Sequence, residues 1–86
     1  MIKLYKFWAP WCGPCRQMAP IVQKVMTRMP HIQLIEVNVD RDPQTAEEFG
    51  IRAVPAMVIE TDKKRATRMG LMTEGNLVGF ILEHTE

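Results

Sequence analysis

The chain lacks the features that would place it in a membrane, on a nucleic acid or outside the cell. None of its apolar runs approaches the ~20 residues that a transmembrane helix needs, so we expect no membrane association. The net charge is only +1, and the single basic cluster, residues 63–65, is short and has no interleaved aromatic residues, so we expect no nucleic-acid binding. The first residues enter a strand pattern directly and show no secretory signal, which predicts a cytoplasmic protein.

The chain is also too short to hold several domains. Its 86 residues are 47% hydrophobic and 24% charged, which is typical of one globular domain covering residues 1–86. A domain of this size buries only about 60% of the surface that its unfolded chain exposes. We find no linker or repeat, and we expect a monomer.

Hydrophobic periodicity predicts the element order β-α-β-α-β-β-α. A long helix should begin near Pro14 and end before Pro30, with a kink at Pro20, and Thr73 is the expected N-cap of the last helix. The expected strands are residues 2–8, 32–39, 56–60 and 66–70, and the two shorter helices are residues 43–49 and 74–84.

This order predicts an α/β fold with a four-stranded mixed sheet and helices on both faces. The two β-α-β crossings predict parallel strands with right-handed connections. The short turn at residues 61–64 predicts that the last two strands are antiparallel.

The two cysteines, Cys12 and Cys15, are spaced Cys-x-x-Cys between a strand and a helix. Unpaired N–H groups and the helix dipole stabilise an anion at a helix N-terminus, and the thiolate is the nucleophile of disulfide exchange. Cys15 lies one turn further on the same side, so Cys12 can attack a substrate disulfide and Cys15 can resolve the mixed disulfide. Pro14 stiffens this loop, and Gly13 lets a substrate chain approach closely.

Three other interpretations of the cysteine pair compete with this one. A structural disulfide over so short a loop would stabilise the fold by only about 2 kcal/mol. A zinc site would need two more ligands, and the two histidines, His31 and His84, lack finger spacing. Inert core thiols fit poorly beside Trp8 and Trp11. We therefore expect no metal, and no cofactor beyond the redox-active pair itself.

The segment 7–15, Phe-Trp-Ala-Pro-Trp-Cys-Gly-Pro-Cys, resembles the active-site segment of thioredoxins residue for residue. Residues 50–55, Gly-Ile-Arg-Ala-Val-Pro, resemble the segment that carries the family's cis-proline, and the resemblance covers almost the whole chain. It implies that Cys12 is the exposed nucleophile and Cys15 the buried resolving cysteine. It also implies that Pro55 is cis and faces the cysteines. The residues implied to form the substrate-docking groove are Trp11, Val54, Pro55 and Gly70.

The chain departs from the typical family pattern in two ways. It resembles the minimal, glutaredoxin-sized versions of the thioredoxin fold, without the usual N-terminal strand and helix. Lys6 also stands where typical thioredoxins bury an aspartate, and Glu36 stands where they have the partner lysine. Either the acid–base pair is inverted, or the two are unrelated solvated charges. As a buried pair, Glu36 would accept the proton of Cys15, and Lys6 would stabilise a thiolate and raise the reduction potential.

The leading functional hypothesis is a protein disulfide reductase. The resemblance implies protein disulfides as substrates, ribonucleotide reductase among them, and recharging by thioredoxin reductase or a similar dithiol donor. An oxidase or isomerase usually has His before the second cysteine, whereas this chain has Pro14. The remaining alternatives are a glutathione-driven enzyme of the glutaredoxin type and a non-catalytic binding subunit of a larger enzyme.

Overall fold

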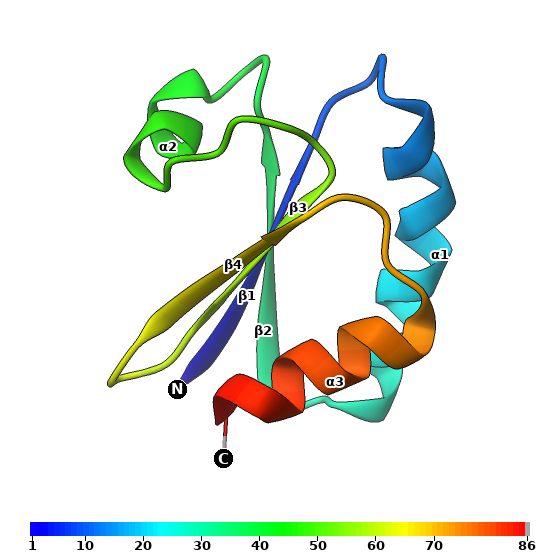
Figure 1. Ribbon diagram of the computed structural model, residues 1–86, viewed down its shortest axis with the longest axis vertical. Coiled ribbons are helices and arrows are strands. Elements are labelled where there is room, and N and C mark those ends of the chain that lie inside the picture. The colour runs from blue at the N-terminus through cyan, green and yellow to red at the C-terminus, as the bar shows by residue number, and fades with distance from the viewer. Residues whose placement is uncertain (86) are drawn as a thin grey trace.

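The computed structural model, which describes residues 1–85, contains the seven elements in the predicted order (Figure 1). Their bounds agree with the expected ones to within one residue, and such small differences are common where helices and strands fray. The strands are β1 (Ile2–Trp8), β2 (Ile32–Asn38), β3 (Ala56–Glu60) and β4 (Arg65–Met69). The helices are α1 (Gly13–Arg28), α2 (Pro43–Glu48) and α3 (Glu74–Thr85).

The sheet has the strand order β2-β1-β3-β4, so β1 and β3 are its central strands. β1 and β2 are parallel, as the first crossing predicts. The expectation of a second parallel crossing is wrong, because β3 runs antiparallel to β1. The physical reason is the length of α2: six residues span about 9 Å, whereas the seven residues of β2 span about 23 Å. α2 stays at the end of the sheet where β2 ends, and the chain then runs back (Figure 1).

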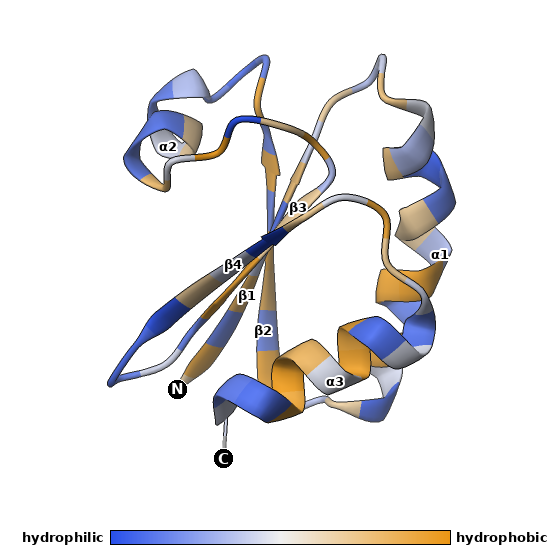
Figure 2. Cartoon of the chain, in the orientation of Figure 1, coloured by the Kyte–Doolittle hydropathy of each residue, from blue (hydrophilic) through white to orange (hydrophobic). Residues whose placement is uncertain are grey.

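The core lies on both faces of the sheet. α1 and α3 cover one face, and α2 covers the upper part of the other (Figure 1). β4, at the edge, is mostly hydrophilic, and its exposed arginines discourage pairing with another chain (Figure 2). The cluster under α1 and α3 contains Leu4, Met18, Val22, Val25, Ile32, Met57, Ile59, Met72, Leu77, Phe80 and Ile81. The cluster on the α2 side contains Phe7, Val37, Ala46, Ala56 and Val58.

Side chains before the shorter helices fix where those helices begin. Asp42 Oδ1 accepts a hydrogen bond from the Thr45 N–H at 3.1 Å before α2, and Thr73 Oγ1 accepts one from the Asn76 N–H at 3.0 Å before α3. The predicted N-cap of the last helix is therefore confirmed. α1 continues from Gly13 to Arg28 with Pro20 inside it.

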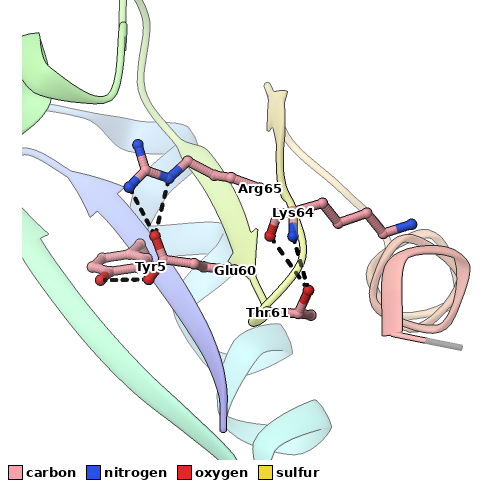
Figure 3. Close-up of polar contacts among 5 residues, drawn as sticks. All are labelled: Tyr5, Glu60, Thr61, Lys64 and Arg65. Atoms are coloured by element: carbon pink, nitrogen blue, oxygen red, sulfur yellow. Dashed lines mark hydrogen bonds and ion pairs between the residues drawn. The ribbon is translucent and has the colours of Figure 1, made fainter.

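The turn between β3 and β4 places the basic cluster at the surface. On the neighbouring sheet face, Glu60 accepts hydrogen bonds from Arg65 Nε at 3.0 Å and from the Tyr5 hydroxyl at 3.4 Å (Figure 3). The Arg65 guanidinium also lies 4.0 Å from the centre of the Phe49 ring. Burial, and secondarily the Glu60 carboxylate, raises the pKa of Tyr5.

Within residues 1–85, no helix is both long and apolar enough to cross a membrane.

Candidate active site

Cys12 and Cys15 lie where β1 passes into α1, and they form a disulfide. Cys12 is the N-cap of α1, and its Sγ accepts a hydrogen bond from the Cys15 N–H at 3.2 Å. The two Cα atoms are 5.3 Å apart, a separation typical of disulfides. The sulfur of Cys12 therefore lies at the start of α1, as the sequence predicts, and one N–H of the first turn, that of Cys15, bonds to it.

Both cysteines are buried in this disulfide form. Cys12 is 4% exposed and Cys15 is 5% exposed, so the expectation that Cys12 is the exposed member of the pair is wrong for this form. The reason is tertiary packing. Both cysteines form one cluster with Ala9, and half-buried side chains that include Val39 and Val54 pack against it. The segments around the cysteines therefore decide what can reach them.

The residues expected to form the docking groove are linked in pairs, and one of them, Val54, packs against the cysteine cluster. The Val54–Pro55 peptide bond is cis, as the resemblance implied. The Gly70 N–H donates a hydrogen bond to the Pro55 carbonyl at 2.8 Å, which joins the segment after β4 to the segment before β3. Trp11 is 67% exposed and shares a hollow of about 170 Å³ with Val54. An exposed aromatic side chain beside an apolar recess is a common docking feature.

Asp40 is a site residue that the sequence did not identify. Its carboxylate accepts a hydrogen bond from Trp11 Nε1, with distances of 3.0 and 3.3 Å to the two oxygens, and so fixes the exposed indole. The signal that could have found it is topological. β1 and β2 are parallel, so their carboxyl ends meet at one edge of the sheet. Trp11 follows the first strand and Asp40 follows the second.

Lys6 and Glu36 form an ion pair on the face of the sheet that α1 covers. They are direct partners in the β1–β2 register, and Lys6 Nζ lies 2.9 Å from Glu36 Oε1. The Lys6 side chain is 9% exposed and that of Glu36 is 48% exposed, so the alternative of two unrelated solvated charges is wrong. Both residues line a pocket of about 210 Å³ whose wall includes Cys15.

Comparison with known proteins gives a consistent result. A family model described as Thioredoxin matches residues 2–83. A thioredoxin of Chlamydia muridarum is 32% identical over 82 residues, which are 94% of this chain and 80% of the relative. Thioredoxin 1 of Synechococcus elongatus is 36% identical over 83 residues, 94% of this chain and 78% of the relative. The X-ray structure of Fasciola hepatica thioredoxin has a TM-score of 0.89 and 30% identity, and the match covers 98% of this chain and 81% of that one.

Proposed function

We propose that this chain, which belongs to the thioredoxin family and is a thiol–disulfide oxidoreductase, works as a reductase of protein disulfides. The observation that carries the proposal is the position of Cys12 at the N-terminus of α1, where its sulfur already accepts the Cys15 N–H. The same N–H would stabilise a Cys12 thiolate after reduction, because it and the helix dipole favour negative charge.

The proposed cycle passes two electrons from the dithiol to the substrate. The Cys12 thiolate attacks one sulfur of a substrate disulfide, and the other substrate sulfur leaves as a thiolate that takes up a proton. Cys15 loses its proton and attacks Cys12 Sγ in the mixed disulfide, which releases the second substrate sulfur. The Cys12–Cys15 disulfide forms, and a dithiol donor reduces it again. The electrons pass through these two sulfurs, so the cycle needs no further cofactor.

The groove beside the disulfide is the proposed binding site for the substrate chain. Three observations support it: Val54 packs against the cysteine cluster, Trp11 lines the same hollow as Val54, and Gly70 is hydrogen-bonded to Pro55. An extended peptide could pair with the backbone of Val54 and lie against the exposed Trp11 indole. This arrangement supports protein disulfides as the substrate class, and ribonucleotide reductase is one example.

The proposed donor is thioredoxin reductase or a similar dithiol source, and the proposed setting is the cytoplasm. Both cysteines of the chain belong to the redox pair, which suits a reducing compartment. We propose a monomer, since one chain carries both cysteines and the groove. A glutathione-driven cycle is the second candidate, because the chain has the size of a glutaredoxin. In a third, the groove serves as a clamp within a larger enzyme and the thiols are incidental.

Reduction of insulin disulfides by dithiothreitol tests the proposal, with precipitation of the free insulin chains as the readout. The wild-type protein should accelerate precipitation, and Cys12→Ser should abolish the acceleration. In the absence of dithiothreitol, reduced Cys15→Ser should accumulate a mixed disulfide with insulin through Cys12, detectable by mass spectrometry. Gln23→Ser, an exposed change on α1, is the matched control and should keep full activity.

Two outcomes would count against a reductase. Wild-type protein that fails to accelerate insulin reduction would exclude this activity. A Cys12→Ser, Cys15→Ser variant that keeps the biological activity of the gene product would favour the binding subunit. Recharging by glutathione, but not by NADPH with thioredoxin reductase, would favour the glutathione-driven cycle.

A further inference from the structure

Lys6 is the one polar or charged residue that is buried within residues 1–85. A buried ammonium loses its hydration, and lysine is almost never buried without a partner. The only ion-pair partner of Lys6 in this part of the chain is Glu36, which is itself half exposed. An apolar side chain of similar volume would fill the same space without that loss of hydration. Packing alone therefore gives no reason for a charge at this position.

The pocket beside Lys6 leads to the disulfide. Its wall contains Lys6 from β1, Glu36 from β2, and both Cys15 and Arg16 from α1. The charged groups that face the pocket are those of Lys6, Glu36 and Arg16. The remaining wall is Trp8, Ala9, Pro10 and Ala19. Arg16 is exposed, and its guanidinium donates a hydrogen bond to the Pro10 carbonyl at 2.7 Å. Of the three charged side chains in the pocket, that of Lys6 is the one buried from solvent, so salt and water screen its charge least.

We propose that Lys6 and Glu36 are positioning residues that set the reduction potential of the Cys12–Cys15 pair, with Lys6 raising it and Glu36 lowering it. This inference rests on the proposed function only in taking the pair to be redox-active. The disulfide is neutral, whereas reduction by two electrons and two protons gives thiols that can release a proton. A fixed ammonium stabilises the resulting thiolate, and a carboxylate destabilises it. A positive charge nearby therefore stabilises the reduced form and raises the reduction potential, and a negative charge does the opposite.

Equilibration with glutathione buffers, read by tryptophan fluorescence, tests the proposal. Lys6→Met should shift the equilibrium constant about tenfold toward the disulfide, which corresponds to a potential lower by about 30 mV. Glu36→Gln should shift it in the opposite direction, because Lys6 then acts without its partner. The pH at which the thiolate absorbs should rise in the first variant and fall in the second. Lys6→Arg keeps the charge and should leave the potential near the wild-type value.

Lys3→Met is the matched control. Lys3 lies on the same strand, an odd number of positions from Lys6 and so on the opposite face, and its substitution should leave the potential unchanged. A merely structural pair would not move the potential in opposite directions. The proposal is overturned if Lys6→Met and Glu36→Gln shift the potential the same way or not at all. If Lys6→Met does not fold, Glu36→Gln and Lys6→Arg still decide the result.

The glutathione equilibrium involves no protein substrate, so its outcome is separate from that of the insulin assay. Opposite shifts together with a failed insulin assay would overturn the reductase and leave the tuning intact. Unchanged potentials together with a successful insulin assay would overturn the role of Lys6 and Glu36 and leave the reductase activity intact.

Discussion

Replacing Gly70 by alanine should destabilise the protein through its backbone alone. Gly70 has a φ of +101°, in the region that side chains disfavour. A Cβ built there meets no heavy atom within 4 Å, so no clash contributes to the cost. Holding a non-glycine residue in such a conformation costs on the order of 1–3 kcal/mol. For a domain of this size, each 1 kcal/mol corresponds to a melting temperature lower by about 4–8 °C.

The same substitution at Gly79 should have the opposite sign. Gly79 lies inside α3, is exposed, and also leaves open space around an added Cβ. Alanine is favoured over glycine in a helix interior by about 1 kcal/mol, so Gly79→Ala should raise the free energy of unfolding by about that amount. The two variants add the same methyl group to equally open surroundings, and only the backbone conformation differs.

Urea denaturation of the oxidised protein, followed by circular dichroism, measures both changes. The Gly70 N–H bonds to the Pro55 carbonyl, so relaxation of Gly70→Ala would also disturb the groove and raise the KM for insulin. Equal stability of Gly70→Ala and wild type would refute the reasoning, because it would mean that the φ of residue 70 is not imposed by the fold. Destabilisation by both alanine variants would show that the added methyl group, rather than φ, is responsible.

Two further predictions concern a titration and a helix cap. The pKa of Tyr5 is raised by burial and by Glu60, so the stability that Tyr5 contributes should be fully present below about pH 10, its ordinary value, and be lost as the pH rises through the raised value. Absorbance of the single tyrosine follows this titration, and Tyr5→Phe should remove the part of the alkaline loss of stability that is due to Tyr5. Thr73→Ala removes the hydroxyl that caps α3 and should lower the free energy of unfolding by about 1 kcal/mol, whereas Thr73→Ser should change it little. An unchanged unfolding midpoint for Thr73→Ala would contradict the capping role.

Local patterns predicted the elements well because each depends on neighbouring residues. The helix after Cys12, the cap at Thr73 and the hairpin at residues 61–64 all follow from side chains a few positions apart. The direction of β3 could not be predicted in this way. The direction of β3 depends on where α2 packs. α2 lies against β2, and its Ala46 belongs to the cluster that contains Phe7.

The site shows the same division between local and distant information. The strand and helix patterns on either side of Cys12 placed it at the start of a helix, but its burial depends on Val39 and Val54, which come from other parts of the chain. The contact of Lys6 with Glu36 depends on the β1–β2 register, which pairs Ile2 with Ile32. Alternation placed each charge on one side of its own strand without fixing that register.

The surroundings of the disulfide divide into two regions that differ in chemistry. The hollow beside Trp11 and the pocket beside Lys6 share no lining residue within residues 1–85. The hollow is lined mostly by apolar side chains and is the proposed docking site, whereas the pocket holds a shielded charge and has Cys15 in its wall. Because electrostatic energy acts through space whereas docking needs contact, the pocket can alter the potential without altering what binds. Evolution could therefore change the substrate range at Trp11 and Val54 while the Lys6–Glu36 pair holds the potential.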